Sequence, residues 1–259
     1  MFPRIITLVL VLCFAFACSS KRPSGNTEAE ILYKEATKLM EDKRYLLAQE
    51  KLNTVKSKYP YSYYATPAEL MQADILFKQE SYIEAAAAYQ LFMEFHPKHQ
   101  EIHYVLWQLA ESFFNQVPPT FDRDLSPAVD AIKYYRDLLQ RFPDSQYAES
   151  AKEKIKKCER MLQDKEQYIA DFYFRTDDYS SARFHYLDIL TNFKDEDLRE
   201  HSMFGVVDSS YLMKSYQECL DYYLSYKDQI KKENLINKMN RRFEQCTEKL
   251  AQEKSARKK

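Results

Sequence analysis

Five histidines are the residues of this sequence best suited to metal binding or acid–base chemistry. His99 and His103 are four residues apart, which would place two imidazoles on one helix face, as in some zinc sites. The sequence contains no H-E-x-x-H motif, and it places no third ligand beside this pair. His96 lies three residues before His99, and His185 and His201 lie far along the chain. We therefore predict histidines on surfaces and in loops, and no metal site.

Nucleophile and cofactor motifs are missing as well. There is no G-x-S-x-G motif, and the 259 residues include only two glycines, which phosphate-binding loops need for close backbone approach. Acidic groups such as Asp177-Asp178 lie between predicted helices, where solvated turns are their usual role. The net charge of −1 gives no field that would attract nucleic acid. We predict a protein that is not an enzyme, uses no cofactor and binds no nucleic acid.

The five cysteines do not form a metal-ligand pattern. Cys13 and Cys18 lie in the N-terminal segment, and Cys158, Cys219 and Cys246 are too far apart in sequence to read as a ligand set. The last three lie in helical patterns, which favours buried, unreactive thiols. A disulfide between Cys219 and Cys246 remains the alternative.

The first seventeen residues have the form of a signal peptide. Arg4 precedes an apolar run over residues 5–17 that is too short to span a membrane and ends in A-F-A before Cys18. Small residues directly before a cysteine are typical of a bacterial lipobox, although Ala15 stands where Leu is usual. We predict cleavage after residue 17, lipid on Cys18 and a flexible tether over residues 18–27. Secretion without lipid remains the alternative.

A repeated pattern indicates which elements make up the rest of the chain. The stretches KYPYSYYATPA, from Lys58, and RFPDSQYAESA, from Arg141, carry Pro, Ser, Tyr and Ala at the same offsets. Each stretch marks the end of a repeated unit. Within the unit, a small residue allows two helices to cross closely, and Pro then ends the second helix. We expect Ser62 and Ser145 to cap the helices that follow. The units are Tyr45/Ala48/Pro60, Tyr82/Ala85/Pro97, Ala128/Ala131/Pro143, Tyr179/Ala182/Lys194 and Tyr216/Cys219.

These units predict an all-α fold, a tetratricopeptide-like superhelix of about five helical hairpins. The third unit contains an insertion, NQVPPTFDRDLSP, and the fourth a longer helix over residues 147–162 that runs towards Tyr173. We assign residues 28–116 to N-terminal units and residues 117–259 to C-terminal units. The second group ends in a basic helix or tail, because residues 227–259 contain 11 Lys and Arg against 5 Asp and Glu.

The first helix of each hairpin is expected to line a concave face. In the first two units the register places three residues of each helix there: Tyr33, Thr37 and Met40, then Leu70, Asp74 and Phe77. Aromatic and bulky apolar side chains commonly anchor a bound peptide. The alternative is that these residues pack against the tether or the neighbouring unit.

Several stretches resemble the BamD family of outer membrane protein assembly factors. FHPKHQEIHYVLW is similar to a family stretch that has P-x-H, here Pro97 and His99, followed by Tyr104-Val105. D-R-D at residues 122–124 and YIADFYFRTDDYSSA resemble the third and fourth units of that family. The resemblance covers residues 18–225.

The resemblance implies a scaffold lipoprotein at the periplasmic face of the outer membrane. It implies binding to the periplasmic domains of BamA, to companion lipoproteins and to unfolded outer membrane proteins. Separately, charged residues of the later units offer a polar surface that we expect to contact the folded partner by electrostatic complementarity, with the groove of the first units left for substrate. The residues of that surface are Asp122, Arg123, Asp124, Arg183 and His185.

Two other functions are compatible with the same pattern. One is a different cell-envelope adaptor with tetratricopeptide units. The other is a glycan-binding lipoprotein of an outer membrane transporter, although such proteins usually carry a larger ligand-binding insertion. Copurification of the native protein would separate the three possibilities.

Overall fold

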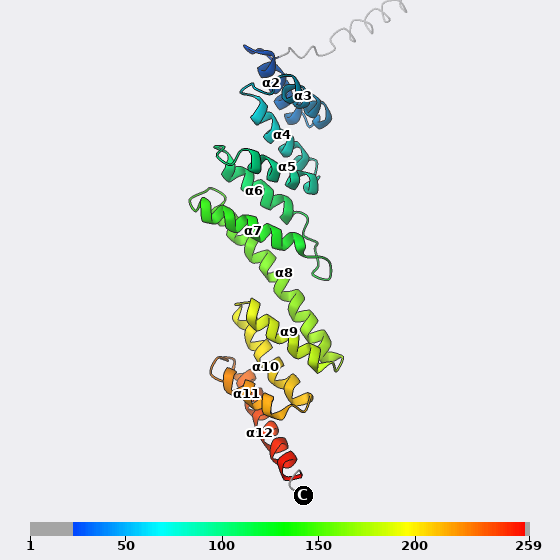
Figure 1. Cartoon of the computed structure of the whole chain (residues 1–259), viewed down its shortest axis with the longest axis vertical. Helices are drawn as coiled ribbons and strands as arrows, with labels where there is room; N and C mark the ends of the chain where they lie inside the picture. The colour runs from blue at the N-terminus through cyan, green and yellow to red at the C-terminus, as the bar shows by residue number, and fades with distance from the viewer. Residues whose placement is uncertain (1–22, 257–259) are drawn as a thin grey trace, which may run out of the picture. The chain divides into compact units, whose positions relative to one another are not determined.

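The computed structural model describes residues 23–256, and this part of the chain is helical without a strand (Figure 1). The signal peptide and Cys18 lie outside the described residues. The all-α, tetratricopeptide-like prediction is confirmed. The helices are α2 (Glu28–Glu41), α3 (Tyr45–Lys58), α4 (Ala65–Lys78), α5 (Tyr82–Phe95), α6 (Ile102–Phe114), α7 (Ser126–Arg141), α8 (Ala148–Arg175), α9 (Tyr179–Asn192), α10 (Glu196–Leu212), α11 (Tyr216–Tyr226) and α12 (Glu233–Ala256).

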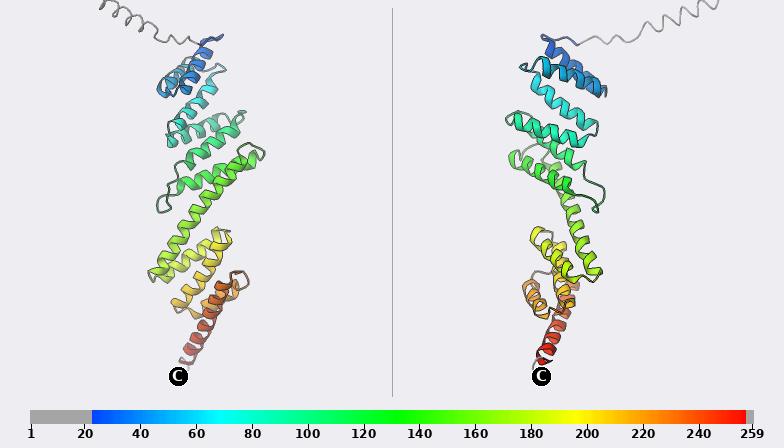
Figure 2. Two further views of the ribbon diagram at one scale, coloured as in Figure 1. Left: turned by 180° about the vertical axis from the view of Figure 1, so that it is seen from behind. Right: turned by 45° about the vertical axis from the view of Figure 1, so that its right-hand side comes forward.

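The chain forms two compact units. The first ends at Ser112 and the second begins at Phe113, so the division falls inside α6. The sequence-based boundary after residue 116 lies slightly further along the chain. Within each unit, helices that follow one another in sequence pack side by side as hairpins, for example α2 with α3, or α10 with α11 (Figure 2).

The repeated residues take the places that the pattern predicts. Four helices begin at their pattern tyrosine: α3, α5, α9 and α11. In each of the five sequence repeats, the small residue three positions after the first pattern residue is fully buried. A larger side chain there would separate the crossing helices. These residues are Ala48, Ala85, Ala131, Ala182 and Cys219, all at 0% exposure.

Each of these four helices is preceded by a turn that has a left-handed residue without glycine. The residue two positions before the tyrosine has φ near +60° in every case: Lys43, Glu80, Asp177 and Lys214. The next backbone N–H then reaches back to a carbonyl of the preceding helix, as from Ser81 to Leu76 at 3.0 Å. This is the Schellman way of ending a helix, which glycine normally serves. The scarcity of glycine therefore did not prevent tight turns.

The prolines lie where helices end, but the serines after them are not helix caps. Pro60, Pro97 and Pro143 each follow the last helical residue by two positions. The expectation for Ser62 and Ser145 is wrong, since α4 begins at Ala65 and α8 at Ala148, without a side-chain cap. Ser145 instead closes the preceding turn, where its Oγ accepts from the N–H of Tyr147 at 3.3 Å.

Helix α8 is longer than predicted. It continues without a break for 28 residues, from Ala148 to Arg175, through the point near residue 162 where the sequence suggested an end. Residues 156–164 carry many long side chains and neither Pro nor Gly, so nothing interrupts the helix. Helix α8 packs against both α7 and α9 and is thereby shared by two hairpins of the second unit (Figure 1).

Candidate functional site: a pocket in the first unit

A pocket of about 850 Å³ opens between α2, the start of α4 and the segment that joins α5 to α6. Its apolar lining includes Tyr33, Leu70 and Met71 together with Pro67 and Phe95. Polar groups from Ser62, Thr66, Asp74, Lys98 and His99 complete the wall. Apolar walls that carry a few polar groups are typical of sites that bind peptides or small molecules.

Asp74 is held in the wall by two tyrosine hydroxyls. Tyr89 of α5 donates to its Oδ1 at 2.7 Å, and Tyr104 of α6 donates to the same oxygen at 2.8 Å. Burial raises the pKa of Asp74, and the two hydroxyls oppose this only in part. The pKa of the Tyr89 hydroxyl is raised in turn, first by burial and then by the charge of Asp74. The carboxyl group therefore joins three helices and is a fixed part of the wall.

The structure brings together only part of the groove that the sequence predicted. Tyr33, Leu70 and Asp74 do line one pocket. Met40 instead packs against the core of the first hairpin, and Phe77 meets the Tyr82 ring edge-on at 5.4 Å. Whether Tyr33 or Asp74 binds a partner stays a prediction. A partner contact of Met40 or Phe77 also stays a prediction.

The segment between α5 and α6 supplies wall residues that periodicity did not identify. Phe95 is 68% exposed at the pocket rim, and Lys98 follows it in the lining. His96 is hydrogen-bonded to Glu69 of α4 at 2.8 Å, and the His99 ring contacts the Phe92 ring edge-on. The signal that could have indicated this segment is the P-x-H stretch itself, which contains Pro97 and His99. Within residues 23–256 no cluster of His, Cys, Asp and Glu could hold a metal ion.

The predicted polar surface of the second unit has two separately anchored parts. Asp122, Arg123 and Asp124 are exposed in the loop before α7. Asp124 accepts from the backbone N–H of Ser126 at 3.0 Å and from its hydroxyl, which lowers the pKa of that carboxyl. The backbone carbonyl of Arg123 accepts from Lys165 of α8 at 3.2 Å. The loop is therefore fixed, and the Arg123 side chain lies exposed on it.

Arg183 and His185 are engaged within the second unit. Arg183 forms an ion pair with Glu218 of α11 and donates to the Ser210 hydroxyl at 3.3 Å. His185 stacks on the Tyr173 ring with centroids 5.3 Å apart. These contacts tie α9 to α8, α10 and α11. Their first role is therefore structural, and a contact with a partner stays a prediction.

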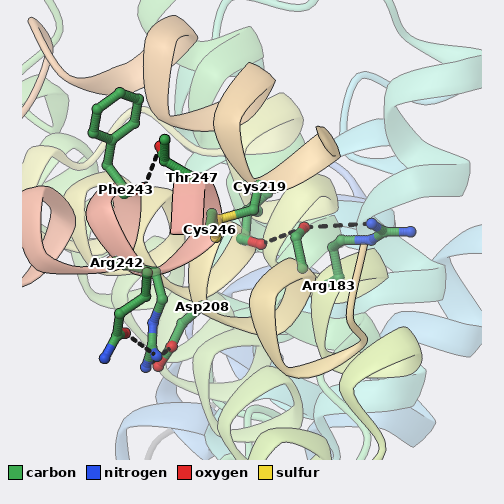
Figure 3. The surroundings of a disulfide bond; sticks show 10 residues. Arg183, Asp208, Cys219, Arg242, Phe243, Cys246 and Thr247 are labelled. Atoms are coloured by element: carbon green, nitrogen blue, oxygen red, sulfur yellow. Dashed lines mark hydrogen bonds and ion pairs between the residues drawn. A yellow bond between two sulfur atoms is a disulfide. The ribbon is translucent and has the colours of Figure 1, made fainter. Parts of the chain in front are cut away.

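The cysteine prediction needs correction. Cys219 and Cys246 form a disulfide that joins α11 to α12, so they are not the inert thiols that we favoured (Figure 3). Their spacing of 27 residues gives no indication of this, because only the folding of α12 back along α11 brings them together. Cys158 is buried and free, as predicted, and burial raises its thiol pKa to about 11.

The same end of the second unit contains a half-buried ion pair. Arg242 of α12 pairs with the Asp208 carboxylate of α10 (Figure 3). The Arg242 guanidinium also lies over the Tyr211 ring, 4.2 Å from its centroid. Glu200 of α10 accepts from the backbone N–H of Lys231 at 2.9 Å. The last helix is thus fixed by a disulfide, an ion pair and a carboxylate.

No helix within residues 23–256 is both long and apolar enough to span a bilayer.

Comparison with known proteins gives the family. The YfiO family of outer membrane lipoproteins matches residues 26–219. The chain belongs to this family. The match to the YfiO family runs from the residue before Thr27, which caps α2, to Cys219 in α11. It therefore covers the pocket, the loop of residues 122–124 and the shared helix α8.

Curated relatives of this YfiO-family chain carry one description. "Outer membrane protein assembly factor BamD" of Rickettsia prowazekii is 25% identical over 222 residues, 85% of this chain and 88% of the relative. The protein of the same description in Vibrio cholerae is 28% identical over 184 residues, 67% of this chain and 76% of the relative. The resemblance to BamD is confirmed.

Among solved structures, the TPR2AB domain of yeast Sti1 in complex with pHSP90 superposes with a TM-score of 0.42 at 13% identity. That superposition covers 90% of this chain and 88% of the other, and at this TM-score it supports no conclusion about function.

Proposed function

We propose that this chain is an assembly factor for outer membrane β-barrel proteins, held at the periplasmic face of the outer membrane by lipid on Cys18. The observation that carries the proposal is the family match over residues 26–219, together with relatives described as assembly factors along most of their length. The Cys219–Cys246 disulfide supports export, because such bonds persist in oxidising compartments such as the periplasm.

The pocket of the first unit is the place we assign to unfolded barrel segments. Barrel strands alternate apolar and polar residues, with aromatic residues near the membrane interfaces. Tyr33, Leu70 and Phe95 offer apolar contacts, and Thr66 and Lys98 offer polar ones beside them. An extended segment with an aromatic side chain matches such a wall in chemistry. Because Asp74 is already bonded to two tyrosines, we assign it the role of fixing the wall.

The exposed loop of the second unit is the place we assign to a folded partner, the periplasmic domains of a BamA-type protein. Arg123 is its exposed cation, between two carboxylates whose pKa values are lowered by hydrogen bonds, by Thr120 for Asp122 and by Ser126 for Asp124. Charges fixed on a rigid loop favour a specific folded partner by electrostatic complementarity. Companion lipoproteins are further partners that we expect in the same complex.

Copurification tests the assignment. The full-length chain, tagged at its C-terminus, is purified in mild detergent from the envelope of the bacterium that encodes it. We expect a BamA-type barrel protein in near-equal amount, with companion lipoproteins. A glycan transporter, or an envelope complex without a barrel-inserting protein, would contradict the proposal and support one of the other two functions.

Two variants test the division between the units. Thr66→Arg introduces a large charged side chain into the pocket wall, and Arg123→Glu reverses an exposed charge beside Asp122. We expect Thr66→Arg to lower capture of an unfolded barrel protein and to leave the BamA-type partner bound, and Arg123→Glu to do the reverse. Circular dichroism confirms that both variants stay folded. Loss of the same partner from both variants would contradict the division.

A further inference from the structure

The described chain begins at a fixed place on α2. The carbonyl of Ser24 accepts from Lys34 at 3.0 Å, and the N–H of Asn26 donates to Glu30 at 2.9 Å. Thr27 caps the helix by accepting from the N–H of Glu30 at 3.2 Å. Residues 24–27 therefore lie against the first two turns of α2, although the sequence suggested a flexible tether that includes them.

The distance from this place to the lipid has an upper limit. Pro23 follows Cys18 by five residue steps, and an extended chain spans at most about 3.6 Å per step, or roughly 18 Å. If Cys18 carries lipid, as the proposed function requires, Pro23 must stay within about that distance of the membrane surface, and the residues that follow it lie against the first two turns of α2. This limit comes from covalent geometry, whatever conformation the residues between them adopt.

An aromatic loop between α3 and α4 lies beside the same end of α2. Residues 59–64, here called the tyrosine loop, contain four tyrosines, and its Tyr64 lies 5.4 Å from the Tyr33 ring of α2. Two backbone bonds hold the loop in shape, from Ser62 to Tyr59 at 3.0 Å and from Ala65 to Ser62 at 3.1 Å. The loop is therefore an ordered feature beside the point where the tether leaves.

Two of its tyrosines are directed into solvent. Tyr61 is 100% exposed and Tyr63 is 81% exposed, whereas Tyr59 and Tyr64 are half-buried. Exposed Lys58 directly precedes the loop. Tyrosine, like tryptophan, is enriched in the headgroup region, with its ring towards the acyl chains and its hydroxyl towards water. A lysine beside it attracts anionic lipid.

We propose that the tyrosine loop lies in the headgroup region of the inner leaflet of the outer membrane, as a second contact beside the lipid of Cys18. One lipid attachment fixes only the position of a chain on a membrane, whereas a second contact also fixes which end faces the bilayer. Tyr63 is also part of the pocket wall, so this orientation places the pocket mouth beside the membrane. A barrel segment in the pocket would be held close to the bilayer that it must enter.

The test uses the full lipidated chain in vesicles of phosphatidylethanolamine and phosphatidylglycerol. Intact mass first verifies the lipid on Cys18, and a chain without lipid overturns the proposal at its premise. A nitroxide is attached at Lys58→Cys, which leaves every tyrosine in place. The matched control is Leu46→Cys, also exposed, at the start of α3 and thus at the opposite end of the first hairpin. The native thiols do not compete, because Cys158 is buried and Cys219 and Cys246 are bonded.

We expect the nitroxide at residue 58 to collide with a water-soluble nickel complex several-fold less often than the nitroxide at residue 46, and more often with oxygen, which dissolves in lipid. Tyr61→Ser with Tyr63→Ser should remove that difference while the chain stays on the vesicle. Equal accessibility at the two positions would overturn the proposal. Protection of residue 58 in native envelopes but not in vesicles would also overturn it, because a protein would then cover the loop.

Failure of the proposed membrane contact can be distinguished from failure of the proposed assembly function. If residue 58 is protected in vesicles but the native chain copurifies without a barrel-inserting protein, the membrane contact stands and the assembly function fails. If the barrel-inserting protein copurifies but residue 58 is as accessible as residue 46, the assembly function stands and the membrane contact fails.

Discussion

Tyr89 donates its hydroxyl hydrogen to Asp74 across the second hairpin, at 2.7 Å. The same relationship recurs in the second unit, where Tyr186 donates to Asp171 at 2.6 Å, and both pairs are 15 residues apart in sequence. A third partner lies 30 residues beyond each aspartate: Tyr104 in the first case and His201 in the second. The hairpins of Asp74 and Asp171 therefore share a hydrogen-bond network as well as an apolar helix crossing.

The pKa values of the two carboxyl groups are shifted in opposite directions. Burial raises the pKa of Asp74, and its two tyrosine partners only partly oppose this. Burial acts on Asp171 in the same direction, but hydrogen bonds from His201 and Tyr186 outweigh it and lower the pKa. The two aspartates are thus equivalent in position and opposite in the pH dependence that they give to stability.

Asp74→Asn should leave stability at neutral pH unchanged or slightly higher, because the amide oxygen can still accept from both tyrosines. In the native chain, folded Asp74 holds a proton in the window between the ordinary carboxyl pKa and its raised pKa, where the unfolded chain has lost it. The free energy of unfolding contributed by Asp74 therefore falls as pH rises through that window. The asparagine variant should lose this slope in urea denaturation between about pH 3 and pH 7.

Asp171→Asn is the matched variant and should behave in the opposite way. The lowered pKa means that the unfolded chain holds a proton that the folded chain lacks, so the stability from Asp171 is lost as pH falls through its folded pKa. We expect a loss of about 1–3 kcal/mol near neutral pH, as for a hydrogen bond to a charged group. Parallel pH profiles for the two variants would contradict opposite pKa shifts of the two aspartates.

The left-handed turn residues offer a route to higher stability. Glu80→Gly and Lys214→Gly should each raise the free energy of unfolding by roughly 0.5–1 kcal/mol, because a residue with a Cβ is strained at positive φ. Glu80→Ala is the control, since it removes the charged side chain and keeps the Cβ. Equal gains from the alanine and glycine variants would mean that the charge, and not the backbone, is responsible.

The disulfide should contribute mainly to the second unit. It closes a loop of 27 residues, for which the chain-entropy estimate is about 3–4 kcal/mol. Cys219→Ser with Cys246→Ser should therefore lower the denaturation midpoint of the part of the chain that contains α11 and α12. A reducing agent should bring the native chain to the midpoint of the double variant and leave the variant unchanged. A midpoint of the native chain that does not respond to reduction would contradict this expectation.

The helix crossings should not tolerate larger residues. Ala131 is fully buried, and Ala131→Leu should cost about 1–3 kcal/mol by overpacking. Ala87 lies exposed on α5, so Ala87→Leu should change stability by less than about 0.5 kcal/mol. Thermal denaturation followed by circular dichroism compares the two variants. Equal effects would place the crossing elsewhere on the helices.

Features set by local periodicity could be predicted from the sequence. The positions of Ala48 and Ala131 at crossings, and of Pro60 at a helix end, follow from residue size and from the restriction before proline. The start of α9 at Tyr179 follows from the same offsets. These features depend on residues within a few turns of one another, so the repeat determines them.

Features set by long-range geometry could not be predicted. The role of Asp74 depends on where hydroxyls 15 and 30 residues away arrive in space, and the sequence places it simply on a helix face. The sequence around Arg183 likewise indicates no ion-pair partner, although the fold brings Glu218 of α11 to it. The disulfide requires α12 to fold back along α11. In each case the deciding partner lies on another helix, at a distance that no local pattern encodes.

Depletion of the chain in the bacterium that encodes it tests the assembly function most directly. The measured quantity is the amount of folded barrel protein in the outer membrane, which resists unfolding by detergent until it is heated and then changes its electrophoretic mobility. The proposed function predicts that this amount falls on depletion, that the native chain restores it, and that Thr66→Arg restores it poorly. Unchanged levels of folded barrel protein after depletion would contradict the proposed function.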